Sequence, residues 1–181
     1  DTTDTTPDTT DDDSGSGSGG DSGGGSSSDF DCDQSVAPDP APGDCVAREV
    51  ACGETFVDTT KGGTSVMDSE EYSSWYCLVF PDGDYSGSER IYYFTHPGTG
   101  NVEVTLDTPC ADLDLFVFQW EYWSTDLTCP TSGHSISSCD AVDDSGGGSL
   151  IVYDNSESHY IIIVDGPEPV EDIFELDITC P

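Results

Sequence analysis

The chain has 181 residues, of which 38 are acidic and only three are basic, giving a formal net charge of −35 at pH 7. This charge argues against nucleic acid and anionic membranes as partners, because both are polyanions. No apolar run reaches the roughly 18 residues that a membrane-spanning helix requires, so we expect no direct membrane insertion.

Eight cysteines are an even number suited to four disulfides, which form in oxidising compartments. The competing interpretation is a zinc site, but no Cys-x-x-Cys pair is present and no histidine lies at ligand spacing from a cysteine pair. We therefore expect an extracellular or cell-surface protein, exported through a signal peptide that is absent from this chain.

Residues 1–31 consist mainly of Asp, Thr, Ser and Gly and contain no aliphatic residue. Such a segment cannot bury enough apolar surface to offset the entropy lost on ordering. We expect an acidic stalk or linker, and a further hypothesis is that it carries O-linked sugars. The candidate acceptors are Thr2, Thr3, Thr5, Thr6, Thr9 and Thr10.

Residues 32–51 are rich in proline and are expected to form a connector that is tied by a local Cys32–Cys45 disulfide. Residues 52–181 alternate between β-branched or aromatic runs and turn sequences, and they show no convincing amphipathic helix. This pattern predicts an all-β domain, an antiparallel β-sandwich of jelly-roll type that is stapled by disulfides.

Residues 110–120 read most clearly as a strand, because the alternation has a period of two. One side carries Leu113, Leu115 and Val117, and the other carries Asp112, Asp114, Phe116, Phe118 and Trp120. Two occupied faces predict a strand inside a sheet, with the aliphatic residues towards the core and the carboxylates at the start of the opposite face.

The remaining disulfides are assigned from strand parity and spacing. Cys180 shares the core-facing parity of the last strand, which favours Cys52–Cys180, and the short spacing of Cys129–Cys139 suggests a loop staple. Cys77–Cys110 is the pair that remains. Eight cysteines permit 105 pairings, so other connectivities stay open.

Four segments of this sequence resemble the bacterial pre-peptidase C-terminal domain, over residues 52–180. They are Tyr92-Tyr93-Phe94, residues 102–106, Asp112-Leu113-Asp114-Leu115-Phe116-Val117, and residues 160–166. The cysteine-rich form is similar to domains in secreted and surface proteins of myxobacteria and their relatives. The resemblance implies a non-catalytic β-sandwich of exported proteins, which in some members binds a polymer such as collagen and in some binds Ca²⁺.

Carboxylates at strand ends are candidate ligands for Ca²⁺, which prefers oxygen donors. Asp112, Asp114 and Asp165 could converge at one end of the sandwich. The alternative is that these aspartates accept backbone N–H groups and fix the turns. A second acidic group, Asp82, Asp84 and Glu89, only loosely resembles a calcium loop, and its alternative is a solvated turn.

An aromatic group formed by Trp120, Tyr122 and Trp123 is the candidate surface for a sugar or a partner protein, with core packing as the alternative for Trp120. No enzyme is expected: the sequence contains no nucleophile elbow, and His96, His134 and His159 lie on separate segments.

The function that follows is a non-enzymatic, extracellular structural or adhesive surface protein, with self-assembly into a surface appendage as a further hypothesis. Its partners would be copies of itself, other surface proteins or an extracellular polymer. The alternative is a Ca²⁺-dependent binding module for a carbohydrate or a protein fibre, in which Ca²⁺ would be the cofactor and no organic cofactor is expected.

Overall fold

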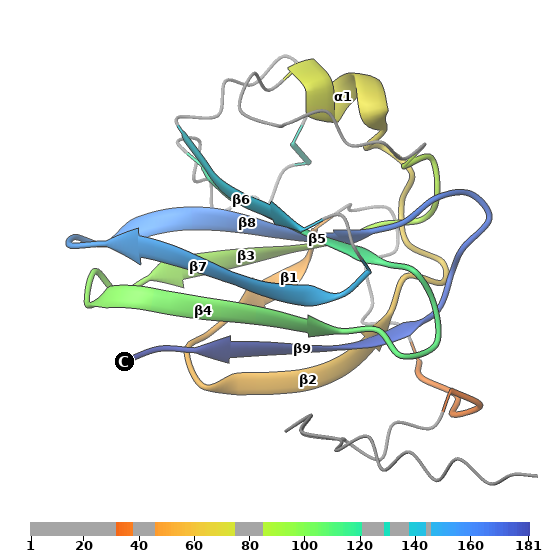
Figure 1. The fold of residues 1–181 in the computed structure, drawn as a ribbon, viewed down its shortest axis with the longest axis horizontal. Coiled ribbons are helices and arrows are strands. Elements are labelled where there is room, and N and C mark those ends of the chain that lie inside the picture. Colours follow the sequence, from red (N-terminus) through yellow and green to blue (C-terminus); the bar gives the residue numbers. More distant parts are fainter. Residues whose placement is uncertain (1–31, 38–45, 75–84, 121–128, 131–137, 144–145) are drawn as a thin grey trace, which may run out of the picture. The chain divides into compact units, whose positions relative to one another are not determined.

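The computed structural model describes residues 32–37, 46–74, 85–120, 129–130, 138–143 and 146–181, and of residues 138–143 it describes the backbone. Two β-sheets face each other (Figure 1). The five-stranded sheet has the order β1 (Val46–Val50), β3 (Arg90–His96), β8 (Ser158–Asp165), β5 (Asp114–Gln119) and β6 (Ser138–Asp143). The four-stranded sheet has the order β2 (Glu54–Thr59), β9 (Ile173–Thr179), β4 (Gly100–Asp107) and β7 (Gly148–Asp154).

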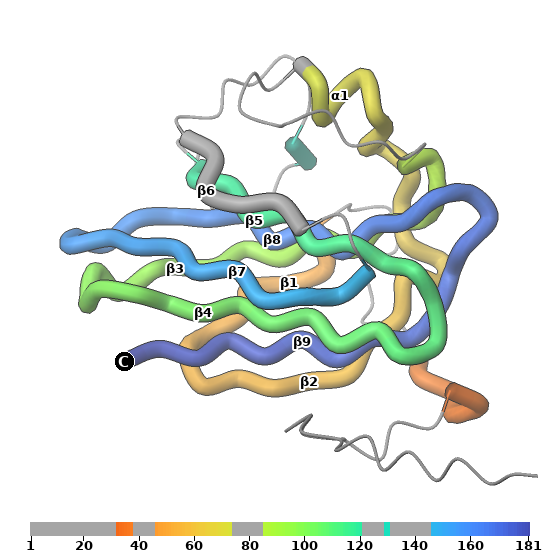
Figure 2. The backbone as a smooth tube through the Cα atoms, viewed as in Figure 1, coloured from red at the N-terminus to blue at the C-terminus, as the bar shows by residue number. Residues whose placement is uncertain are grey.

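The strand orders 3-8-5-6 and 2-9-4-7 are those of a jelly roll, in which the chain passes repeatedly from one sheet to the other (Figure 2). These neighbours pair antiparallel, which confirms the predicted fold class. β1 is added at the edge of the five-stranded sheet, where it runs parallel to β3. The segment expected as a connector, residues 32–51, therefore supplies a strand of the sandwich.

The core between the sheets follows from the alternation of the strands. In β4, Val102, Val104 and Leu106 are buried, while Glu103 is exposed. β9 repeats the pattern, with Phe174, Leu176 and Ile178 in the same core cluster. Alternation of this kind buries one face of a strand and leaves the other in water.

β5 has two buried faces, as predicted. Leu115 and Val117 belong to the core between the sheets, whereas Phe116 and Phe118 belong to a second cluster. That second cluster covers the outer face of the five-stranded sheet. Its members are Val46, Met67, Tyr72, Tyr85, Ile91, Tyr93, Phe116, Phe118, Trp120, Ile161 and Ile163.

One short helix, α1 (Ser69–Ser74), departs from the expectation that the chain has no helix. Asp68 caps its N-terminus, because its Oδ1 accepts the backbone N–H groups of Glu70 and Glu71, each at 2.8 Å. Six residues are too few to display an amphipathic period, so only the cap signalled the helix in the sequence. The helix supplies Tyr72 to the second cluster.

One predicted disulfide is present in the structure, and a second disulfide differs from the predicted pairing. Cys52–Cys180 is present and links residues 128 positions apart. Cys32 pairs with Cys110, so the predictions Cys32–Cys45 and Cys77–Cys110 are wrong. Proximity in sequence was a poor guide, because the packing of the sandwich brings Cys32 to the loop between β4 and β5. Cys45 and Cys77 lie outside the described residues. Cys129 is disulfide-bonded, and Cys129–Cys139 stays a prediction.

Candidate functional site

Two of the three aspartates predicted to converge do so. Asp114 and Asp165 are direct partners in the β5–β8 ladder, and their side chains are 5% and 0% exposed. Asp112 is exposed and lies beside Gly146, where an added Cβ would come within 2.3 Å of the Asp112 Oδ1. Gly146 has a φ of +78°, and its N–H donates to the Asp114 Oδ1 at 3.0 Å.

Glu89 adds a third carboxylate to this pair. It directly precedes Arg90, the partner of Val164, so the β3–β8 register places it opposite Asp165. Its side chain is 0% exposed. Glu89 just before β3, Asp165 at the end of β8 and Asp114 at the start of β5 therefore form a buried acidic row. The convergence of Asp114 and Asp165 was predicted from the sequence, but the position of Glu89 beside them was not, because it depends on the order of strands that are far apart in the chain.

Tyrosine hydroxyls and backbone N–H groups donate hydrogen bonds to the two aspartates of the acidic row. The Tyr72 hydroxyl donates to the Asp165 Oδ2 at 2.7 Å, and the Tyr85 hydroxyl donates to the Asp114 Oδ2 at 2.8 Å. The Gly166 N–H donates to the Asp165 Oδ1 at 2.7 Å. Both aspartates thus accept backbone N–H groups at strand ends, which was the alternative to calcium binding.

Among the described residues, only one of the two carboxylate oxygens of Glu89 accepts hydrogen bonds. Its Oε1 accepts the Thr64 hydroxyl at 2.6 Å and the Val66 N–H at 3.0 Å. Its Oε2 is buried without a hydrogen-bond partner among the residues that the structure describes. An unpaired carboxylate oxygen at this depth favours a protonated row over a fully ionised one.

The surroundings of the row favour the protonated form of its carboxyl groups. Burial, with smaller contributions from the charges of Glu89 and Asp114, raises the pKa of Asp165 from its ordinary 3.8 to about 8. The hydrogen bonds from Tyr72 and from the Gly166 N–H act in the opposite direction. Burial also raises the pKa of Glu89. The protonated form of Asp165 is therefore favoured near neutral pH.

The described residues do not assemble a metal centre. Among them, no three His, Cys, Asp or Glu side chains are placed to hold one ion. The oxygens of Asp114 and Asp165 are used by tyrosine hydroxyls and backbone N–H groups instead. Asp82 and Asp84, the partners predicted for Glu89, lie outside the described residues, so that calcium site stays a prediction.

Of the predicted aromatic surface, the structure describes only Trp120. Trp120 is 1% exposed and belongs to the second cluster, which is the core role that was its alternative. Tyr122 and Trp123 lie outside the described residues, as do the candidate acceptors for O-linked sugars in residues 1–31. No helix among the described residues is both long and apolar enough to cross a membrane.

A solvent-exposed sheet surface was not predicted from the sequence: the outward side of the four-stranded sheet, which we call the open face. On β7, Ile151 is 58% exposed and Tyr153 is 59% exposed. Leu150 and Val152 of the same strand face the core. The signal was present in the sequence, because Leu150-Ile151-Val152-Tyr153 is apolar at every position and not at alternate ones.

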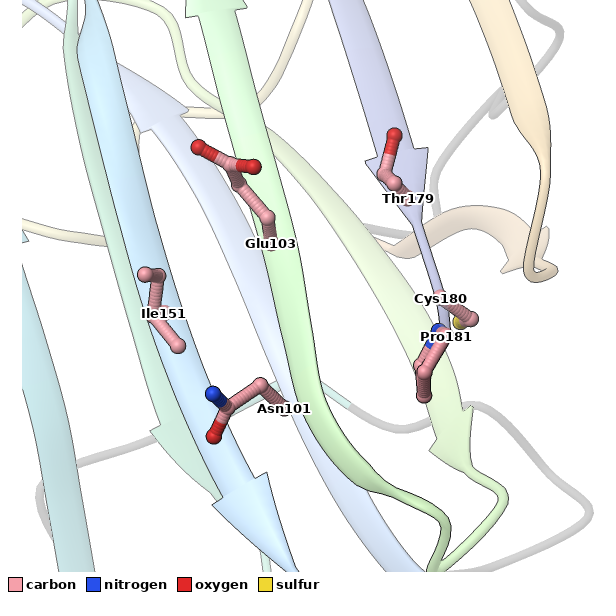
Figure 3. A pocket seen from close by; sticks show the side chains of 6 residues that line it. All are labelled: Asn101, Glu103, Ile151, Thr179, Cys180 and Pro181. Atoms are coloured by element: carbon pink, nitrogen blue, oxygen red, sulfur yellow. The ribbon is translucent and has the colours of Figure 1, made fainter.

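A hollow of about 250 Å³ lies on the open face. Side chains from β7, β4 and the end of β9 surround it (Figure 3). They belong to Asn101, Glu103, Ile151, Thr179, Cys180 and Pro181. The Cys52–Cys180 disulfide thus fixes one border of the hollow.

The open face is acidic and rich in hydroxyl groups. Its outward positions include Glu103 and Asp107 on β4 and Glu175 and Asp177 on β9, and among the outward positions of these described strands none is basic. Hydroxyl groups orient two of the carboxylates. Asp177 accepts the hydroxyls of Thr55 and Thr179, and Glu103 accepts the hydroxyl of Ser149.

The three basic residues of the chain lie elsewhere. Arg48 forms an ion pair with Glu54 and covers the Phe56 ring at 4.1 Å. Arg90 is 3% exposed and donates to the backbone carbonyls of Thr59 and Lys61. Lys61 is exposed just after β2. The two arginines therefore contact β2 and the residues that follow it, and neither lines the hollow on the open face.

The disulfides are typical of proteins outside the cytoplasm, so we assign the chain to an extracellular or envelope compartment. No protein-family model matches the chain, and no curated protein matches it. Among solved structures, it is similar to CorA, a surface-associated copper-binding protein of Methylomicrobium album BG8. The identity is 7% over 76% of this chain and 99% of that one, with a TM-score of 0.47.

It is also similar to PliG of Aeromonas hydrophila, a periplasmic inhibitor of g-type lysozyme, with 9% identity over 75% of this chain and 99% of that one and a TM-score of 0.37. A third similar structure is the pre-peptidase C-terminal domain of a collagenase from Bacillus anthracis, with 7% identity, 77% of this chain and 100% of that domain covered, and a TM-score of 0.41. This domain is of the family that the sequence motifs resemble.

Proposed function

We propose that this chain is a non-catalytic, exported β-sandwich that acts as an adhesive surface component, and that the open face makes the adhesive contact. The observation that carries the proposal is the exposure of Ile151 and Tyr153 beside the hollow. Two large apolar side chains on one exposed strand are a feature of interaction surfaces.

The opposite side of the sandwich supports this choice of surface. Residues of α1 and the segment around Met67 and Tyr85 cover the outer face of the five-stranded sheet with a buried aromatic cluster. The outward side chains of the four-stranded sheet include the exposed Ile151 and Tyr153, so the open face keeps apolar surface in contact with water.

The chemistry of the acidic row favours a non-catalytic role. Paired carboxylates can serve as acid and base in hydrolysis only if substrate and water reach them. Asp165 and Glu89 are 0% exposed, and the Tyr72 and Tyr85 rings pack against Phe116 at 4.4 Å and 5.2 Å beside them. The row serves the fold in this proposal.

Adhesion is tested by retention of the full chain on beads coated separately with collagen, cellulose and chitin. We expect at least one polymer to retain it, and the double variant Ile151→Ser/Tyr153→Ser to lose that retention. Val66→Ser is the matched control, because Val66 is 42% exposed and lies away from the open face. Equal loss in the control, or no retention of the parent chain, would contradict the proposal.

A further inference from the structure

The hollow on the open face has the dimensions of a site for one side chain. Its volume of about 250 Å³ falls below the roughly 300–1,000 Å³ of sites that enclose small organic ligands. We propose that it receives a lysine or arginine side chain from an extended basic segment of another protein, which lies across β9, β4 and β7. This inference rests on the proposed adhesive role of the open face and names the chemistry of its partner.

Charge complementarity is the first argument. Glu103 lines the hollow, and Asp177 lies on the neighbouring strand β9 opposite Thr105. Asp107 and Glu175 are direct partners across the β4–β9 ladder. Like charges directly opposite each other destabilise a sheet. A positively charged partner on this face would relieve that repulsion, whereas a neutral partner would not.

The orientation of Glu103 is the second argument. Ser149 donates its hydroxyl to the Glu103 Oε1 and accepts the Thr105 hydroxyl at 3.3 Å. This chain of hydroxyl groups holds the carboxylate in place before a partner arrives. A carboxylate that is already oriented loses less entropy when it pairs with a cation.

The aromatic border is the third argument. Tyr153 is the ladder partner of Asn101, which lines the hollow, and Ile151 is the partner of Glu103. The Tyr153 hydroxyl donates to the Asn155 Oδ1 at 2.7 Å, which holds the exposed ring. A tyrosine ring attracts the ammonium or guanidinium group of a neighbouring cation. The carboxylate and the amide line the hollow, and the ring lies at the ladder position next to the amide, where it could attract the same basic side chain.

Other occupants fit the open face less well. A second copy of this chain would bring the same net negative charge, and because its Arg48 and Arg90 are engaged within its own fold, it could offer only Lys61 and no basic segment. An anionic polymer would be repelled, and a neutral glycan would leave the carboxylates unpaired. We therefore commit to a basic protein segment, and the experiment treats the other occupants as contrary outcomes.

The probe is a short fluorescent peptide in which lysine alternates with threonine, because an extended chain then presents its lysines on one side. Its binding to the full chain is followed by anisotropy at about 0.15 M ionic strength. We expect Glu103→Gln and Tyr153→Ala each to raise the Kd about threefold to fivefold, the range of a partly exposed charge contact. Glu70→Gln on α1 removes the same charge from an exposed site and should leave the Kd within about twofold.

The inference is overturned if Glu70→Gln weakens binding as much as Glu103→Gln, because the attraction would then be diffuse. It is also overturned if a peptide with serine in place of lysine binds equally well, or if the chain self-associates through the open face. Thermal midpoints of all variants confirm folding. If Tyr153 is needed for retention on a polymer but the lysine peptide neither binds nor competes, the adhesive role stands and the basic partner does not.

Discussion

Asp114 and Asp165 lie directly opposite each other on β5 and β8, and each accepts the hydroxyl of a different buried tyrosine. Two neighbouring carboxyl groups that are buried away from water are not both ionised, because their negative charges would repel each other. Burial raises the pKa of Asp165 from its ordinary 3.8 to about 8, and the charge of Asp114 adds to this rise. The protonated form of Asp165 is therefore favoured in the folded state, and the calcium site expected from Asp112, Asp114 and Asp165 stays a prediction.

The first prediction concerns the pH dependence of stability. The folded pKa of Asp165, about 8, exceeds its ordinary 3.8, so between these values the folded state binds a proton that the unfolded state has released. Stability contributed by this group is therefore full below pH 4 and falls as the pH rises towards 8. The loss is on the order of a few kcal/mol. Asp165→Asn imitates the neutral carboxyl and should flatten this dependence in urea unfolding.

Repulsion among the other acidic residues also grows with pH, so the comparison needs a control. Glu157→Gln removes one exposed carboxylate in the turn between β7 and β8. It should keep the slope of the parent chain between pH 5 and pH 8. If Asp165→Asn and Glu157→Gln give the same slope, Asp165 is not the group that titrates.

The second prediction concerns Tyr72, which connects α1 to the acidic row. Tyr72→Phe keeps the ring stacked on Phe116 but removes the hydroxyl that donates to Asp165. Loss of a buried hydrogen bond to a carboxyl group should lower the free energy of unfolding by about 1–3 kcal/mol. Tyr153→Phe removes an exposed hydroxyl and should cost less than about 0.5 kcal/mol in the same denaturation experiment. Equal costs would show that the Tyr72–Asp165 contact does not stabilise the fold.

The third prediction concerns disulfide connectivity. Proteolysis without reduction, followed by mass spectrometry, should yield one linked fragment that contains Cys32 and Cys110 and another that contains Cys52 and Cys180. Cys110→Ser should lower stability by about 2–5 kcal/mol, because the bond closes a long loop. Recovery of a fragment that links Cys32 to Cys45 would contradict the structure.

The fourth prediction concerns calcium. Because the oxygens of Asp114 and Asp165 are occupied by internal donors, removal of Ca²⁺ with EDTA should leave the thermal midpoint of the chain unchanged. A ligand that binds the folded state raises the midpoint with its concentration. A rise in the midpoint on adding millimolar Ca²⁺ would favour the alternative function, a Ca²⁺-dependent binding module.

The sequence predicted correctly those strands in which burial requires every second side chain to be apolar. The two faces of β5 and the core face of β9 were predictable, because a strand that packs between layers must alternate its side chains. Parity likewise gave Cys52–Cys180, since both residues lie at strand ends. These features depend on local geometry, which the order of residues encodes directly.

The features that sequence reasoning missed depend on strand order. Glu89 joins Asp165 only because β3 and β8 are neighbours, and Cys32 reaches Cys110 through the packing of distant segments. The open face was missed for a different reason. The run from Leu150 to Tyr153 is apolar at every position, but a strand buried on both faces has the same pattern, so the exposure of Ile151 and Tyr153 was needed to distinguish the two cases.

Hydroxyl-radical footprinting of the chain, free and bound to the polymer that retains it, tests the central claim most directly. Tyr153 and Ile151 are accessible in the free chain, and Val66 on the other side is an internal reference. We predict that binding lowers the oxidation of Tyr153 and Ile151 and leaves Val66 unchanged. Protection of Val66 with continued oxidation of Tyr153 would contradict the assignment of the open face as the adhesive surface.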